Sequence, residues 1–99
     1  MARLSPQELA HFRSVSAVNA LIALASYAKR DLSFIPTEAK GTERWHATVG
    51  RAHFELLLLG PKFFDTRARI GGGGAIDLAI HLYGLQFKEA IALLRTRGL

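Results

Sequence analysis

The sequence contains no cysteine, one methionine and one tryptophan. The lack of cysteine excludes disulfide bonds, cysteine-ligated zinc and a thiol nucleophile. Long apolar runs are also missing, because the longest mainly apolar stretches, residues 20–25 and 54–59, fall far short of the ~18 apolar residues of a membrane-spanning helix. The N-terminal sequence MARLSPQELAHF has charge and helix-capping chemistry where a signal peptide has an apolar core. We therefore expect a soluble, cytoplasmic protein with no membrane partner.

The length and composition are those of one small globular domain. The 99 residues suffice for a single modest core, so residues 1–99 are expected to form one module. Apolar residues make up 49% of the chain, which predicts a globular fold and not a disordered tail. There are 13 Lys and Arg against 8 Asp and Glu, giving a net charge of +5. This surplus favours polyanionic partners, although it is spread along the chain.

Helix signals occur at both ends of the sequence. Residues 5–8 read Ser-Pro-Gln-Glu, the pattern of a capping box with proline at the first helical position. Apolar residues then recur at helical spacing, which predicts helices over residues 5–28 with a second start at Ser14 or Ser16. The same spacing predicts helices over residues 75–95.

Between these helices, residues 43–70 alternate with a period of two. Three strands are expected, joined by turns at residues 50–51 and 60–62, which makes an antiparallel meander. The third strand is expected over residues 62–70 and ends at the glycines of residues 71–74. The predicted fold is α+β, with a small three-stranded antiparallel β-meander, zinc-ribbon-like but metal-free, flanked by N-terminal and C-terminal helices.

Residues 63–94 read FFDTRARIGGGGAIDLAIHLYGLQFKEAIALL, in which an aromatic pair, a glycine run, Ala-Ile-Asp and Gly-Leu-Gln-Phe-Lys-Glu-Ala follow one another. This order resembles the second half of the N-terminal zinc-binding domain of bacterial replicative primases, including cysteine-poor versions attached to toprim domains in plasmid and phage proteins. The family's two cysteines would fall at Thr66 and Arg69, and its upstream Cys-Pro-x-His pair is absent. His46 and His53 remain, too few for a tetrahedral site. The resemblance therefore implies a form that has lost its zinc ligands, and no metal or cofactor is expected.

The resemblance also implies contact with single-stranded template through a sheet face, which requires positive charge and exposed rings. Strand alternation predicts that Arg67 and Arg69 share a face with Phe63, and Arg44 and His46 are candidates for the same face. The predicted nucleic-acid-binding residues are Arg44, His46, Arg51, Lys62, Phe63, Arg67 and Arg69. The expected function is a non-catalytic accessory module that binds single-stranded DNA, or another nucleic acid, in the replication or transfer of a plasmid, phage or integrated element.

Other interpretations remain open at this point. A protein-interaction or structural module would dock a toprim or helicase partner, in replication or mobilisation, through an apolar helix surface with Tyr27, Leu24 or Leu82 and Tyr83 as candidates. A third interpretation is a solvated sheet face with ordinary charges. An enzyme is not expected, because the carboxylates are scattered singly and no Gly-x-Ser-x-Gly sequence occurs.

Overall fold

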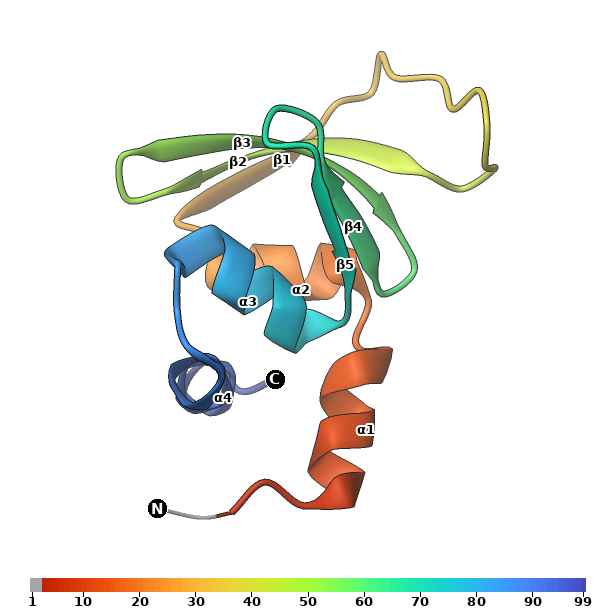
Figure 1. Cartoon of the computed structure of the whole chain (residues 1–99). Coiled ribbons are helices and arrows are strands. Elements are labelled where there is room, and N and C mark those ends of the chain that lie inside the picture. Colours follow the sequence, from red (N-terminus) through yellow and green to blue (C-terminus); the bar gives the residue numbers. More distant parts are fainter. Residues whose placement is uncertain (1–2) are drawn as a thin grey trace.

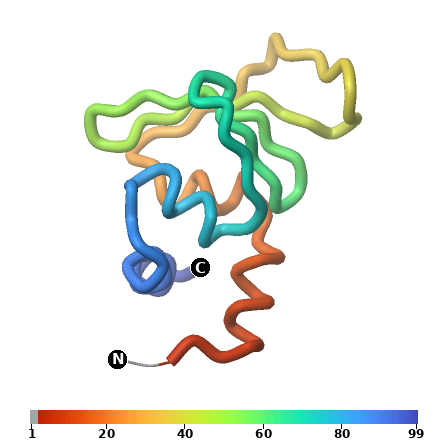
Figure 2. Tube along the Cα trace, in the orientation of Figure 1, coloured from red at the N-terminus to blue at the C-terminus, as the bar shows by residue number. Residues whose placement is uncertain are grey.

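The computed structural model describes residues 3–99, which form one five-stranded antiparallel sheet and four helices. The elements are α1 (Pro6–Ser14), α2 (Ala17–Leu24), β1 (Tyr27–Arg30), β2 (Glu43–Val49), β3 (Ala52–Leu59), β4 (Lys62–Asp65), β5 (Ile70–Gly73), α3 (Ala75–Tyr83) and α4 (Phe87–Thr96). The helices all lie on one side of the sheet, with α2 and α3 nearest to it and α1 and α4 beyond them (Figures 1 and 2). None of the helices in residues 3–99 is long and apolar enough to cross a membrane.

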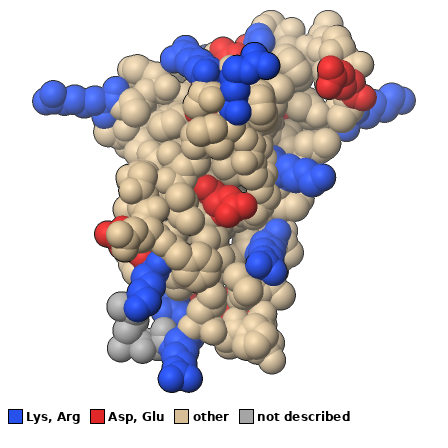
Figure 3. Space-filling model, viewed as in Figure 1, with Lys and Arg blue, Asp and Glu red and all other residues tan. Residues whose placement is uncertain are grey.

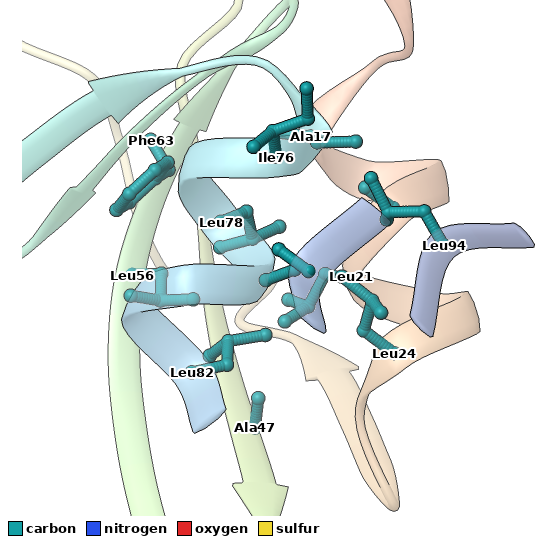
Figure 4. Close-up of a cluster of buried hydrophobic side chains, with 14 of the residues drawn as sticks. Ala17, Leu21, Leu24, Ala47, Leu56, Phe63, Ile76, Leu78, Leu82 and Leu94 are labelled. Carbon is teal, nitrogen blue, oxygen red and sulfur yellow. The ribbon is translucent and has the colours of Figure 1, made fainter. Parts of the chain in front are cut away.

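The hydrophobic core lies between the sheet and helices α2 and α3 (Figure 4). Trp45 and Ala47 of β2 are buried, whereas Arg44 and His46, which alternate with them along the strand, are not, so the period-two pattern of the sequence selects the core face. The largest fully buried side chains are Phe12, Leu21, Leu24, Leu56, Leu58, Leu78 and Leu94. Each such side chain contributes roughly 1.5–3 kcal/mol on burial, so apolar packing holds these strands to the helices.

The helix starts follow the predicted capping chemistry. The Oγ of Ser5 accepts from the amide of Glu8 at 3.0 Å, and the Oγ of Ser16 accepts from the amide of Asn19 at 3.1 Å. Each bond satisfies one of the amides that the first helical turn leaves without a partner. The second helix therefore starts at Ser16, one of the two predicted positions, and both caps are confirmed.

The α+β class is confirmed, but the predicted three-stranded meander is wrong, because the sheet has five strands in the order β1-β2-β3-β4-β5. The helical region expected to reach residue 28 ends at Leu24. The amide of Ser26 then donates to the carbonyl of Thr48 at 2.8 Å, and β1 pairs with β2. Three of the four β1 residues are exposed, so this edge strand lacks the strong apolar alternation that would reveal it.

Residues 62–70, expected as one strand, form β4, a turn and the start of β5. The Oδ1 of Asp65 accepts from the amides of Arg67 at 2.9 Å and Ala68 at 3.0 Å, which reverses the chain directly after β4. The glycines expected to break the sheet instead continue it as β5. A Cβ at Gly72 would lie 2.8 Å from Cε1 of Phe63, so the aromatic ring of one strand occupies the space that a side chain on the other would need.

Candidate nucleic-acid interface

The sheet face turned away from the helices, called the open face below, carries the predicted site. Residues paired across antiparallel strands lie on the same side, and successive residues alternate between sides. Trp45, Ala47 and Leu56 point to the helices. The residues that alternate with them along β2 and β3, together with the residues paired with these across the sheet, therefore form the open face. It consists of Tyr27, Lys29, Arg44, His46, Thr48, His53, Glu55, Leu57, Leu59, Lys62 and Phe64. No helix of residues 3–99 covers it (Figure 1).

Three of the predicted binding residues, Arg44, His46 and Lys62, lie on the open face. Arg51 lies in the turn between β2 and β3, and Arg67 and Arg69 lie in the turn between β4 and β5. That second turn stands at the end of the sheet on the side away from the helices (Figure 1). The structure therefore places these six residues on the open face or in turns that adjoin it.

Phe63, the seventh predicted residue, does not share a face with Arg67 and Arg69. Its side chain is 4% exposed and packs in the core, and strand alternation no longer applies to the two arginines because β4 ends at Asp65. Phe64 is the ring on the open face, with 39% of the residue exposed. The two adjacent phenylalanines thus have opposite roles, and the sequence alone does not distinguish them.

Arg44 is fixed by a network centred on Asp31. Its Nε donates to the Asp31 carboxylate at 2.9 Å, its Nη2 lies 2.7 Å from the same oxygen, and its guanidinium lies 5.1 Å from the ring centroid of Phe34. His46 Nε2 is 3.3 Å from this oxygen, and the other carboxylate oxygen of Asp31 accepts from the amide and hydroxyl of Ser33. The Ser33 hydroxyl, followed by Arg44, holds the pKa of Asp31 well below its usual range. Arg44 therefore braces the segment after β1 more than it presents free charge.

Five other basic side chains at or beside the open face are free of such pairing. They are exposed and form no ion pair within residues 3–99: Lys29, Arg51, Lys62, Arg67 and Arg69. Basic side chains gather at the top of Figure 3, at the end of the sheet where the β4–β5 turn lies. Unpaired cations of this kind neutralise phosphates and release their counterions, which makes binding salt-dependent.

Exposed rings and a groove accompany these charges. Tyr27 is 58% exposed at one edge of the open face, with Phe64 near the other. Between the segment 31–42 and strands β3 and β4 lie two adjoining hollows of about 350 and 270 Å³. Both are lined by Leu57 and Thr42, while Phe64 lines the first and Phe34 the second. The groove thus offers apolar and aromatic walls beside Lys62.

The turn that carries Arg67 and Arg69 is anchored from the core by Asp65. This carboxylate is 3% exposed, and its Oδ2 lies 2.6 Å from Nε2 of His81 on α3. Burial alone would raise the pKa of Asp65, but the Ala68 amide, His81 and the Arg67 amide together lower it. Sequence reasoning missed this role, because an aspartate after two phenylalanines reads as a polar strand residue.

The same turn contains the positions where the primase resemblance places cysteines, Thr66 and Arg69. Here the hydroxyl of Thr66 donates to the side chain of Glu55 at 3.0 Å, and Arg69 has a φ of 59°. His53 is 3.0 Å from the hydroxyl of Thr48. Residues 3–99 contain no cluster of three or more side chains able to hold a metal ion. Hydrogen bonds and packing hold this turn.

Sequence reasoning also missed Tyr27 and Lys29 on the open face. Their period-two spacing was a signal, but four residues are too few to distinguish a strand from the end of a helix. The residues proposed for an apolar docking helix do not form such a surface, because Leu24 is 0% and Leu82 is 5% exposed. Tyr83 is half-buried, and its hydroxyl donates to the carbonyl of Leu24.

Comparison with known proteins supplies one partial likeness. No family model matches the sequence, and no solved structure matches it significantly. A stretch of 44 residues is 43% identical to part of the "65 kDa protein" of Zymomonas mobilis subsp. mobilis. The match covers 44% of this chain but only 8% of that protein, so the chain spans a small part of the relative's length. The name of that protein states its mass and no activity, ligand or partner.

Proposed function

We propose that the chain is a non-catalytic module that binds single-stranded nucleic acid across the open face. The observation that supports this proposal is the combination, on one uncovered sheet face, of free lysines and exposed rings. Lys29 and Lys62 supply charge to phosphates, and Tyr27 and Phe64 supply surfaces on which bases stack. Stacking of a base on an aromatic side chain is worth about 1–3 kcal/mol and tolerates any base.

The arrangement favours single strands over duplexes. Bases in a single strand are free to stack on side chains, whereas in a duplex they are already stacked and paired. The groove at Leu57 and Thr42 adds an apolar site next to Phe64, into which an unstacked base fits beside Lys62. The basic turns carrying Arg51, Arg67 and Arg69 extend the charge beyond the strands, where they meet the continuing backbone of the nucleic acid.

The resemblance of residues 63–94 to primase zinc-binding domains adds support, since that family contacts template strands through its sheet. On this basis we place the function in the cytoplasm, in the replication or transfer of a plasmid, phage or integrated element, with single-stranded DNA as the partner. The two carboxylate–imidazole contacts in residues 3–99, at Asp31 and Asp65, both brace chain segments, which favours a binding role over catalysis.

The proposal is tested by fluorescence anisotropy of a labelled single-stranded oligonucleotide at two salt concentrations. The double variant Lys29→Ala/Lys62→Ala is compared with the double variant Arg13→Ala/Lys88→Ala, which removes exposed cations on α1 and α4. Each double variant lowers the net charge by two, from +5 to +3. Only the first is expected to weaken binding strongly, with a log–log salt slope reduced by about 1.4, since each lost phosphate contact removes about 0.7.

The ring contribution has its own matched pair. Phe64→Ala is expected to weaken binding by 1–3 kcal/mol, about 5- to 150-fold. Phe87→Ala removes a ring that is 49% exposed on α4 and is expected to leave binding unchanged. Equal weakening of oligonucleotide binding by the Lys29/Lys62 double variant and by its Arg13/Lys88 control, or no binding at low salt, would contradict the proposal. The open face would then be an ordinary solvated surface.

A further inference from the structure

The segment that joins β1 to β2, residues 31–42, exposes two large apolar side chains. Leu32 is 84% exposed and Ile35 is 79% exposed, more than any other large apolar side chain in residues 3–99. Neither of them lines the two hollows of the groove, whereas Phe34 and Pro36 line the second one. The segment thus forms a wall of the groove and carries Leu32 and Ile35 outside it. Two bare apolar side chains within four residues indicate a contact that the fold itself does not make.

Hydrogen bonds hold this segment in place. The amide of Asp31 donates to the carbonyl of Arg44 at 2.8 Å, and the amide of Phe34 donates to the carbonyl of Asp31 at 3.3 Å. The Asp31 carboxylate accepts from the Ser33 amide at 2.9 Å, and the half-buried Phe34 ring packs against the guanidinium of Arg44. These contacts fix the backbone on both sides of Leu32 and leave its side chain in water. An apolar side chain held in this way binds with little further loss of conformational freedom.

The segment lies beside the open face. In Figure 1 it rises beyond the sheet on the side away from the helices. Thr42, at its end, lines both hollows of the groove, and Lys62 and Phe64 line the first hollow. A single strand that places bases in the groove therefore runs along this segment. A duplex that continues from the strand is too wide to follow it, so its last base pair stops at the wall that carries Leu32 and Ile35.

Charge on and beside the segment favours the flat faces of bases over phosphates as its contact. Residues 29–44 contain four basic and three acidic side chains, a net charge of +1. Arg44 pairs with Asp31, and Arg30 lies 3.6 Å from Glu43. Anionic lipid surfaces and phosphate backbones attract strongly basic segments, which this one is not. The face of a base pair carries no net charge, and leucine and isoleucine are among the side chains that proteins insert between base steps.

We propose that the module binds the junction between a single strand and a duplex, with Leu32 and Ile35 inserted as a wedge at the last base pair. The single strand lies in the groove and along the open face, and the wedge partly unstacks the end of the duplex. This inference rests on the proposed function and names its substrate more closely. The preferred ligand is a junction, and a uniform single strand binds more weakly.

The test uses a DNA duplex with a single-stranded tail and 2-aminopurine, a base whose fluorescence rises on unstacking, at the first paired position. We expect the protein to raise this fluorescence. We also expect it to bind the tailed duplex at least about fivefold more tightly than the tail alone, because burial of two apolar side chains outweighs partial unstacking of one step.

A matched pair of variants assigns the effect to the wedge. Leu32→Ala/Ile35→Ala is expected to bind the tail alone within about twofold of the original protein, since exposed substitutions cost little. The same variant is expected to lose both the fluorescence rise and the preference for the tailed duplex. Ile22→Ala, which shortens a side chain 56% exposed on α2, is expected to keep both.

Three outcomes would overturn the proposal. The first is equal binding of the tailed duplex and the tail, and the second is a fluorescence rise that persists in the Leu32/Ile35 double variant. The third is a dimer in sedimentation that dissociates in this variant, because a second copy of the chain would then cover the two side chains. Binding of the tail alone reports on the open face by itself. Tail binding without a junction preference overturns only the wedge, whereas no tail binding overturns the proposed function as well.

Discussion

Removal of the Asp65 carboxylate tests whether hydrogen bonds from the core hold the basic β4–β5 turn. One oxygen accepts from the amides of Arg67 and Ala68, and the other lies 2.6 Å from Nε2 of His81. In Asp65→Ala, all three groups lose this partner. Leaving a buried polar group unsatisfied costs about 1–3 kcal/mol, but amides in a turn regain part of this by reaching water. We therefore expect the free energy of unfolding to fall by about 2–4 kcal/mol.

The conservative variant separates hydrogen bonding from charge. Asp65→Asn keeps an oxygen for the two amides, so we expect a loss of about 1–2 kcal/mol, smaller than for alanine. Urea unfolding followed by the fluorescence of Trp45, the single buried tryptophan, measures both variants. The reasoning is refuted if Asp65→Ala unfolds within about 0.5 kcal/mol of the original protein, the range of ordinary surface changes.

The pH dependence of stability provides a second readout of the same carboxylate. Burial would raise the pKa of Asp65, but hydrogen bonds from the Ala68 amide, His81 and the Arg67 amide hold it below its usual value of about 3.9 in the folded protein. Its contribution is therefore fully present above that value and is lost as the pH falls through the unfolded-state pKa towards the folded one. Asp65→Asn is expected to flatten this acid limb. The lowered pKa values of Asp31 and Glu8 act in both proteins and cancel in the difference.

Two further predictions concern packing and capping. Gly72→Ala is expected to lower the free energy of unfolding by about 1–3 kcal/mol, because its Cβ would meet the Phe63 ring at 2.8 Å, whereas Gly73→Ala, with nothing within 4 Å, costs about 1 kcal/mol or less. Equal losses in the two would contradict the packing argument. Ser16→Ala is expected to cost about 1 kcal/mol through loss of the α2 cap, and Ser16→Gly only a few tenths, both by urea unfolding. A larger loss for glycine than for alanine would be the contrary result.

The part of the fold that the sequence predicted correctly depends on side-chain signals that repeat or cap. Ser5 and Ser16 mark helix starts through a hydroxyl at a defined distance from an amide, and Trp45 and Ala47 mark the buried face of β2. β5 escaped prediction because glycines carry no side chain to alternate. Their strand conformation depends on Phe63 filling the space opposite Gly72, which is a long-range contact.

The candidate site was predictable to the same degree. Arg44, His46 and Lys62 reached the open face because they lie on regular strands, where alternation holds. The prediction for Phe63 was wrong because either of two adjacent aromatic residues could point to the core, and tertiary packing decides which one is buried. The network that restrains Arg44 links Asp31 to a strand residue 13 positions away, and no local pattern encodes that contact.

Residue-resolved mapping of a bound oligonucleotide tests the central claim most directly. The 15N-labelled protein is titrated with a short single-stranded DNA of mixed sequence at low salt. Each amide signal that shifts is assigned to a residue of the open face, of the adjoining turns or of the helices. We predict the largest shifts at Lys29, His46 and Phe64 on the open face and in the turn at Arg67, all diminishing as salt is added. Shifts confined to the exposed surfaces of α1 and α4, or none at millimolar protein, would contradict the assignment of the open face as a nucleic-acid interface.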